Sequence, residues 1–235
     1  MHHLRRFTGP LAALVFSLPT LAQADGPLVV IELFTAQGCS SCPPADLLLE
    51  QMAKNVEVLP LAFHVDYWDY LGWQDQFATP AHTARQKDYA HAAGERMIYT
   101  PQAIVNGAAR VIGSDSQALM SALMHEMNKD PIATLSLTRS GESLDIKGTS
   151  LGAVSGPVEV LLVRYVPQAS VEILHGENAG KTVKYINIVS SVTPIGQWAG
   201  NDALSLTVPI TGTDSAAVLL QSPGMGPVIA AALVR

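Results

Sequence analysis

The chain has 235 residues, of which 48% are hydrophobic and 14% are charged, and its formal net charge at pH 7 is −6. This apolar content is enough for one large domain or two small ones, and no segment has the composition of a disordered protein. An acidic chain without a block of lysine and arginine is a poor candidate for binding nucleic acid or anionic membranes, so we exclude both classes of partner.

The first 24 residues have the three parts of a secretory signal peptide. A positive start at Arg5 and Arg6 is followed by an apolar run over residues 11–18 and by the small-residue sequence AQA. We expect the mature chain to begin near Asp25 and to be periplasmic or secreted, with a formal charge of −8 after the loss of two arginines from the −6 total. A membrane helix needs roughly 20 apolar residues, so we expect no membrane span after signal removal.

The next segments predict a β-α-β unit. Residues 28–34, LVVIELF, form an apolar, β-branched run between Gly-Pro and a polar turn, which is typical of a buried strand. A helix is expected from about Ser41 to Lys54, and a second strand over residues 56–63. Such a unit favours a parallel strand pair with a right-handed crossover.

The following segments complete a small α/β unit. A second helix is expected over residues 74–93, despite Pro80. Two short strands then lie on either side of Asn106-Gly107, which is a strong hairpin signal. A last helix is expected to end at about Lys129. The predicted order is therefore β-α-β-α-β-β-α.

The sequence pattern changes at residue 130. From there onward the sequence has only short strand-like runs, separated by glycine, proline and serine, and no helical periodicity. We therefore expect an α/β domain over residues 25–129, followed by a smaller all-β, sandwich-like domain over residues 130–235.

The motif GCSSCPP contains the only two cysteines, Cys39 and Cys42, at the predicted turn from the first strand into the first helix. Proline is tolerated only in the first turn of a helix, so Pro43 and Pro44 place both cysteines at the helix start. The helix dipole lowers the pKa of a thiol there. In this arrangement Cys39 is normally the exposed attacking thiolate, and Cys42 resolves the mixed disulfide.

Three other interpretations of the motif remain open. A passive disulfide is one, although so short a loop removes little entropy from the unfolded chain. Metal binding, including copper, is another, but the motif supplies only two ligands, and His64, His82 and His91 lack ligand spacing to it. The third is a pair of unrelated cysteines. We predict no metal site and no cofactor.

The strings ELFTAQGCSSCPPAD, HVDYWDYLGW, YTPQAIVNG and HGENAGKTVKYINIV resemble the DUF1223 family of secreted thioredoxin-like proteins, over nearly the whole mature chain. The resemblance implies a thioredoxin-like domain over residues 25–129, followed by a β-rich domain. It also implies that Pro101 has a cis peptide bond, lies against the disulfide and belongs to the catalytic site with the two cysteines.

Four further residues are candidates for the site. Glu32 is the nearest counterpart of the buried aspartate of thioredoxins, and in that role it would act as a base toward Cys42. Alternatively, Glu32 faces solvent or pairs with a basic residue. Tyr67, Trp68 and Thr100 are candidates for binding a partner, because sites form at strand ends in α/β sheets. Packing of a long loop is the alternative role for the aromatic residues.

These observations predict an exported thiol-disulfide oxidoreductase or redox carrier. Its partners would be protein thiols or disulfides and a redox partner in the cell envelope. The alternative is a non-catalytic binding protein, in which the α/β domain is a scaffold and the disulfide is inert.

Overall fold

The computed structural model describes residues 27–234, and the predicted signal peptide lies outside them. The helices are α1 (Pro43–Met52), the 3₁₀ helix η1 (Asp69–Leu71), α2 (Pro80–Ala92) and α3 (Ser116–Met127). The strands are β1 (Val29–Thr35), β2 (Val58–His64), β3 (Gln102–Val105), β4 (Ala109–Ile112), β5 (Ala133–Ser140), β6 (Ser143–Ser150), β7 (Val158–Glu172), β8 (Thr182–Trp198), β9 (Leu204–Pro209), β10 (Ser215–Gln221) and β11 (Val228–Leu233). No helix in this range is long and apolar enough to cross a membrane.

The predicted order of the first seven elements is confirmed, including the parallel pairing of β1 with β2 and the β3–β4 hairpin. The predicted start of the second helix is wrong. Helix α2 begins at Pro80, because proline fits the first turn of a helix. The hydroxyl of Thr79 accepts a hydrogen bond from His82 N at 3.2 Å and caps that turn.

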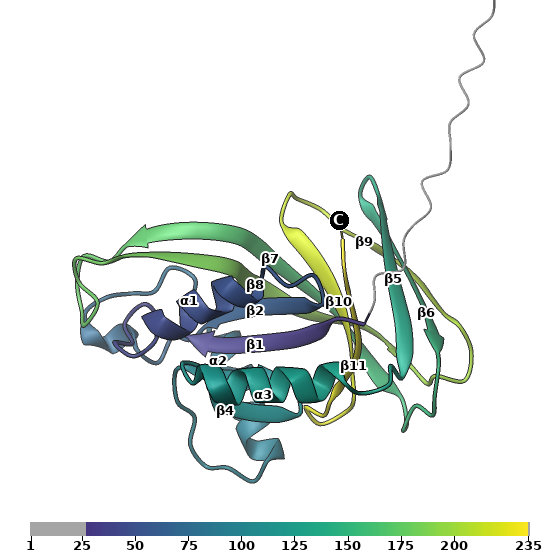
Figure 1. Ribbon diagram of the computed structural model, residues 1–235. Coiled ribbons are helices and arrows are strands. Elements are labelled where there is room, and N and C mark those ends of the chain that lie inside the picture. Colours follow the sequence, from purple (N-terminus) through teal and green to yellow (C-terminus); the bar gives the residue numbers. More distant parts are fainter. Residues whose placement is uncertain (1–26, 235) are drawn as a thin grey trace, which may run out of the picture.

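The expected architecture, a helix-flanked thioredoxin-like domain followed by a separate all-β domain, is wrong. Strands from both halves of the chain form one eight-stranded sheet in the order β11-β10-β7-β8-β2-β1-β3-β4. Figure 1 shows the long strands β7 and β8 running beside β2 and past α1. The protein is mostly β, with a second sheet of three strands in the order β5-β6-β9.

The two halves join because β8 covers the open edge of β2. An uncovered strand edge leaves its N–H and C=O groups without partners. Strand β8 pairs in parallel with β2 at Ala62 and Ile188. One residue earlier, Asn187 has a φ of 44° and donates from Nδ2 to the carbonyl of Pro60 at 2.8 Å. The Asn187 side chain therefore supplies a hydrogen bond to β2 beside Pro60, which has no N–H of its own to contribute to the pairing.

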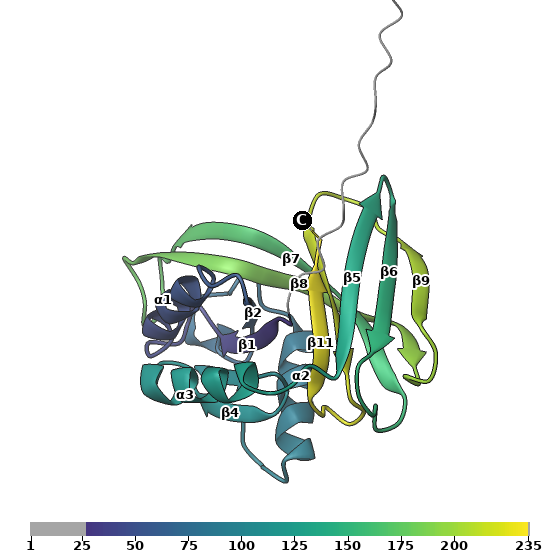
Figure 2. The ribbon, with the colours of Figure 1, turned by 45° about the vertical axis from the view of Figure 1, so that its right-hand side comes forward.

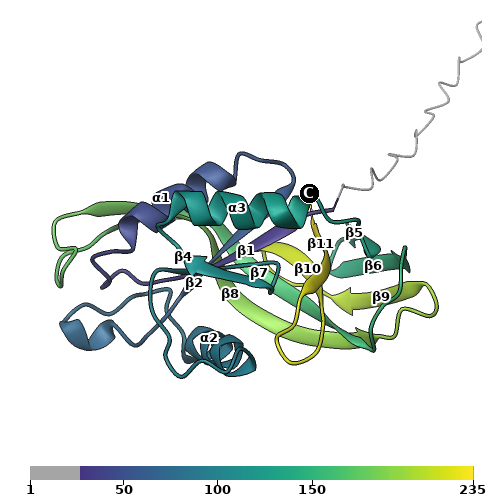
Figure 3. The same cartoon turned by 60° about the horizontal axis from the view of Figure 1, so that its bottom comes forward.

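The helices lie on both faces of the large sheet (Figure 3). Helices α1 and α3 pack on one face through a cluster that includes Ile31, Leu49 and Leu119. Helix α2 packs on the other face, where Tyr89 joins a cluster with Phe34 and both cysteines. The three-stranded sheet packs against β7, β10 and β11 at the far end of the molecule (Figure 2).

Candidate functional site

The predicted Cys39–Cys42 disulfide is present, and it lies between the end of β1 and the start of α1. Cys42 is the N-cap residue of α1, without a side-chain cap hydrogen bond, and Pro43 and Pro44 form the first turn. The prolines thus place the cysteines at the helix start, as the sequence predicted. Nearby, the Thr100-Pro101 peptide bond is cis, also as predicted.

Both cysteines are buried, which corrects the expectation that Cys39 is exposed. Cys39 is 1% exposed and Cys42 is fully buried, whereas Ser40 and Ser41 between them are exposed. The hydroxyl Oγ of Ser41 lies 3.5 Å from Cys39 Sγ. Two other segments of the chain cover the CxxC turn, one packed against the cluster that holds both cysteines and one bonded to the backbone of the turn.

The first covering segment follows β2 and contributes Trp68. Its ring packs against the cluster that contains both cysteines, and a Cβ on Gly38 would lie 3.3 Å from Trp68 Cβ. Its Nε1 donates to Thr100 Oγ1 at 2.7 Å, next to the cis peptide bond. Of the predicted partner-binding residues, Trp68 and Thr100 therefore lie together beside the CxxC turn.

Tyr67 lies in the same segment. Its hydroxyl donates to Gln86 Oε1 on α2 at 3.2 Å, and burial raises the pKa of this hydroxyl to about 12. Gln86 also donates to the backbone oxygen of Tyr99 at 2.7 Å. Tyr67 thus helps to anchor the segment that carries Trp68 to α2.

The second covering segment is the loop between β7 and β8, residues 173–181, which we call the hairpin loop. The Nδ2 atom of Asn178 donates to the carbonyl oxygens of Gln37 at 2.9 Å and of Cys39 at 2.8 Å. Asn178 is 1% exposed. The polar sequence HGENAGKT therefore has a defined place, with its asparagine against the backbone of the CxxC turn.

A buried polar cluster lies directly behind the turn. His64 Nδ1 is 2.7 Å from Asp75 Oδ2, which also accepts from Gln37 N at 2.8 Å. Asp46, one helical turn after Cys42, accepts from Thr35 Oγ1 at 2.8 Å. We call Asp46, His64 and Asp75, with Thr35 and Gln37, the α1-side cluster.

The α1-side cluster is incompletely hydrogen-bonded. Asp46 Oδ2, His64 Nε2 and Gln37 Nε2 are buried and have no hydrogen-bond partner within residues 27–234. Burial raises the pKa of Asp46 to about 7, against the lowering effects of His64 and of the Thr35 hydrogen bond. Tyr185 of β8 packs edge-on against His64, with ring centroids 4.6 Å apart. A carboxyl group with a pKa raised to about 7 thus lies one helical turn after Cys42.

Glu32 pairs with a basic residue, which is one of the two alternatives for it. On the α2 side of β1, its carboxylate accepts from Arg85 at 2.6 and 2.8 Å and from Tyr89 at 2.6 Å. Gln221 of β10 donates to the Tyr89 hydroxyl at 2.8 Å. We call these four residues the α2-side cluster. Both oxygens of Glu32 are therefore engaged in joining β1, α2 and β10.

Sequence reasoning missed three residues of the site: Asp46, Asp75 and Asn178. Asp46 gave a weak signal, because it stands four residues after Cys42 on the predicted helix. From the sequence, His64 lacks the spacing to the cysteines that a metal ligand would need. Among residues 27–234, no group of three or more histidine, cysteine, aspartate or glutamate side chains is arranged to hold a metal ion.

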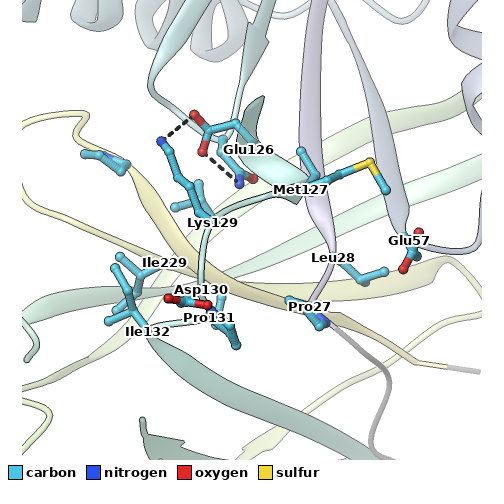
Figure 4. Close-up of a pocket in the computed structure, with 15 residues that line it drawn as sticks. Pro27, Leu28, Glu57, Glu126, Met127, Lys129, Asp130, Pro131, Ile132 and Ile229 are labelled. Carbon is cyan, nitrogen blue, oxygen red and sulfur yellow. Dashed lines mark hydrogen bonds and ion pairs between the residues drawn. The ribbon is translucent and has the colours of Figure 1, made fainter. Parts of the chain in front are cut away.

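A cavity of about 240 Å³ lies away from the cysteines, at the start of β1 and the end of α3 (Figure 4). Glu126 in its wall accepts from Lys129 at 2.6 Å and from Asn106 at 3.5 Å. Pro27 and Ile229 also line it. Since the CxxC turn follows the other end of β1, this cavity is separate from the candidate site.

Comparison with solved structures finds two matches. The crystal structure of protein AGR_C_4864 from Agrobacterium tumefaciens is 31% identical, with a TM-score of 0.76, and the alignment covers 90% of this chain and 96% of that one. HBP35 of Porphyromonas gingivalis is 13% identical, with a TM-score of 0.65 and 88% and 74% coverage, and this similarity concerns the fold alone.

No curated protein matches the chain. The family model described as "Protein of unknown function (DUF1223)" matches residues 30–221, which include the CxxC turn, Pro101 and the hairpin loop. The resemblance found in the sequence is thereby confirmed at the level of the family. The chain belongs to the DUF1223 family.

Proposed function

We propose that this protein exchanges disulfides with thiols outside the cytoplasm, and that Cys39 and Cys42 are the reacting pair. The observation that carries the proposal is the disulfide between residues three apart at the first turn of α1. In the chain-entropy model, closing so short a loop contributes only about 2 kcal/mol. A passive staple is therefore a weak explanation for this bond.

The surroundings of the pair support thiolate chemistry. Pro43 and Pro44 have no N–H groups to donate to a thiolate, so the stabilising groups are the dipole of α1 and the hydroxyl of Ser41, 3.5 Å from Cys39 Sγ. Cys39 precedes the helix and Cys42 caps it, which supports Cys39 as the attacked sulfur and Cys42 as the leaving group.

The exchange proceeds in two steps. A partner thiolate attacks Cys39 Sγ, forming a mixed disulfide, while the Cys39–Cys42 bond breaks and Cys42 leaves as a thiolate. A second partner thiol then attacks the partner sulfur of the mixed disulfide and releases Cys39. Two partner thiols are oxidised to one disulfide, and the protein disulfide is reduced to a dithiol with two protons. The reverse sequence reduces a partner disulfide.

We propose that Asp46, rather than Glu32, donates the proton that the leaving Cys42 thiolate takes up. Asp46 N donates to Cys42 O at 3.1 Å in the helical i, i+4 pattern, and side chains with this spacing are neighbours on a helix surface. A pKa of about 7 suits a group that gives a proton to the leaving Cys42 thiolate near neutral pH. Glu32, by contrast, is held in its ion pair with Arg85.

The extracytoplasmic location is part of the proposal. It is supported by the signal-like sequence of the first 24 residues and by the disulfide, because disulfides persist in oxidising compartments.

The test uses Cys42→Ala, which removes the resolving thiol. Mixed with an oxidised model protein, this variant is expected to accumulate a mixed disulfide through Cys39, visible as a mass increase that a reductant reverses. Cys39→Ala is the matched control and is expected to trap much less. Equal trapping by the two variants, or none by either, would contradict the proposal.

The burial of both cysteines favours a second candidate, a binding protein with an inert disulfide. In that case native protein would keep its disulfide in all glutathione buffers, and Cys39→Ala would leave partner binding and every thiol-exchange rate unchanged. The trapping experiment separates the two functions.

A further inference from the structure

His64 is a buried titratable residue that takes no part in the exchange steps described above. It ends β2 and is fully buried. Its Nδ1 atom lies 2.7 Å from Asp75 Oδ2, which also accepts from Gln37 N. An ionised carboxylate only accepts hydrogen bonds, so it holds the imidazole with a proton on Nδ1. The other nitrogen, Nε2, is therefore the one that gains or loses a proton.

Two contacts place Asp46 beside His64. Thr35 lies directly opposite His64 in the β1–β2 pair, where the two side chains are on the same side of the sheet. The Thr35 hydroxyl donates to Asp46 Oδ1 at 2.8 Å. Tyr185 of β8 packs against the His64 ring, with centroids 4.6 Å apart. Burial raises the pKa of its hydroxyl, and the charges of Asp46 and Asp75 raise it further. Tyr185 thus lies against the imidazole and close to both carboxylates.

Asp46 and His64 each have one buried atom without a partner. Asp46 Oδ2 and His64 Nε2 have no hydrogen-bond partner among residues 27–234. Buried polar atoms in native proteins nearly always have one. Both atoms can carry a proton, as a carboxylic acid at Oδ2 and as an imidazolium at Nε2. They are therefore the two places where the α1-side cluster can hold a further proton.

The charge of the cluster favours such a proton. With both Asp46 and Asp75 ionised and His64 neutral, two negative charges are buried together, which is unfavourable. One further proton, at either Asp46 Oδ2 or His64 Nε2, halves that charge. Both placements give the same net charge, so net charge does not decide between them. In agreement, burial raises the pKa of Asp46 to about 7, while the charge of His64 lowers it.

The other titratable groups around the pair bind elsewhere. Asp69 Oδ1 accepts from Asp75 N at 3.1 Å, and burial raises the pKa of Asp69. His82 Nδ1 lies 2.9 Å from the backbone oxygen of His64, and burial lowers the pKa of His82. The charged groups that act on Asp46 are His64 and Asp75.

We propose that His64 is a positioning residue for thiol exchange, because His64 Nε2 and Asp46 Oδ2 share one proton that Asp46 supplies to Cys42. When Asp46 gives up the proton, the Cys42 thiolate becomes a thiol, and the cluster keeps two ionised carboxylates beside a neutral imidazole. When the disulfide forms again, the pair takes the proton back. The sharing is a property of the folded, oxidised protein, whereas its use in exchange rests on the proposed function.

Nuclear magnetic resonance of the oxidised protein tests the sharing. The carbon-13 signal of the Asp46 carboxyl and the nitrogen-15 signal of the His64 ring are expected to change together in two pH steps. The first proton is divided between the two atoms, and the second occupies both. In His64→Gln, the Asp46 signal is expected to change in one step, about one pH unit higher. A loosened core would lower that pH instead, since burial is the main cause of the raised Asp46 pKa.

The matched control is His82→Gln, at a second buried histidine, whose ring packs against Phe63 with centroids 5.3 Å apart. It is expected to leave the Asp46 titration unchanged. The same one-step titration of Asp46 in the wild type and in His64→Gln would overturn the inference. If near-UV circular dichroism shows that His64→Gln is unfolded, Asp46→Asn replaces it. The His64 signal should then lose one of its two steps, and keeping both would overturn the inference.

Reduction by dithiothreitol separates this inference from the proposed function. At pH 8, His64→Gln is expected to react about fivefold faster than the wild type, because a rise of about one unit from a pKa of about 7 increases the protonated fraction of Asp46 by that factor. Equal rates would contradict the positioning role. A disulfide that dithiothreitol reduces in none of the folded proteins would instead contradict the proposed function, while the shared titration would stand.

Discussion

The two faces of β1 carry two buried polar clusters with opposite character. In the α2-side cluster, every polar atom of Glu32 is paired with Arg85 or Tyr89. In the α1-side cluster, Asp46 Oδ2 and His64 Nε2 have no hydrogen-bond partner in the described part of the chain. A fully satisfied cluster stabilises a fold. The α1-side cluster, by contrast, contains a carboxyl group with a raised pKa near the CxxC turn. We therefore assign a structural role to the α2-side cluster and propose a chemical role for the α1-side cluster.

The largest expected effect comes from breaking the α2-side cluster. Arg85→Met leaves the buried Glu32 carboxylate without its cation, and we expect a loss of about 5 kcal/mol in the free energy of unfolding, because removing one partner of a buried ion pair strands the other. Urea unfolding measures this loss. The double variant Glu32→Gln, Arg85→Met should recover much of it, whereas equal losses in both variants would contradict the pairing.

The next effect concerns stability as a function of pH. Folding raises the pKa of Asp46 from 3.8 to about 7, mainly through burial. The folded protein therefore binds this proton more tightly than the unfolded chain does, so the stabilisation is complete below pH 4 and is lost as the pH rises to about 7. At 1.36 kcal/mol per pKa unit, the loss is about 4 kcal/mol.

Urea unfolding at pH 4 and pH 8 measures this loss. The difference between the two pH values should be smaller in Asp46→Asn than in the wild type by about that amount, since the amide does not titrate. The same difference in both proteins would show that Asp46 keeps an ordinary pKa.

A smaller effect is expected on the rate of exchange. Below pH 7, protonated Asp46 can give its proton to the leaving Cys42 thiolate, so Asp46→Asn should slow reduction by dithiothreitol about tenfold there. Above pH 8 the two rates should converge, because Asp46 is then ionised in the wild type. Rate profiles from pH 5 to 9 measure this, and a constant ratio across the range would indicate a purely structural role.

The smallest expected effect tests whether the Thr35 hydrogen bond lowers the pKa of Asp46. The Thr35 hydroxyl lowers the pKa of Asp46, so Thr35→Val should raise that pKa further and cost about 1 kcal/mol at high pH. Carbon-13 NMR of the Asp46 carboxyl follows its titration. Thr83→Val, which removes a comparable 2.6 Å hydrogen bond to Asp66, is the matched control. A lower pKa in Thr35→Val would contradict this assignment.

The local features of the site were predictable from the sequence. Cys39 and Cys42 lie three residues apart at a helix start that Pro43 and Pro44 identify, and the hairpin at Asn106-Gly107 has a turn that glycine specifies. Each of these signals depends on residues a few positions apart. The helix order of the first half was predictable for the same reason.

The architecture was not predictable, because it depends on a long-range pairing. The contact between Ala62 and Ile188 makes one sheet of both halves, and neither strand carries a signal for the other. Asn178 lies 139 residues from Cys39, and its hydrogen bond to the Cys39 carbonyl oxygen could not be read from either segment alone. Asp46 could only be assigned once its burial was known, since aspartate in a first helical turn is usually exposed.

If the proposed function is right, the buried Cys39–Cys42 disulfide reacts in the folded protein. Equilibrating the native protein in glutathione buffers and trapping free thiols measures its reduction potential. We expect reversible reduction at a potential within the range of about −270 to −120 mV that is typical of CxxC oxidoreductases. A disulfide that resists reduction until urea unfolds the protein would contradict the proposed exchange and leave an inert bond within a binding protein.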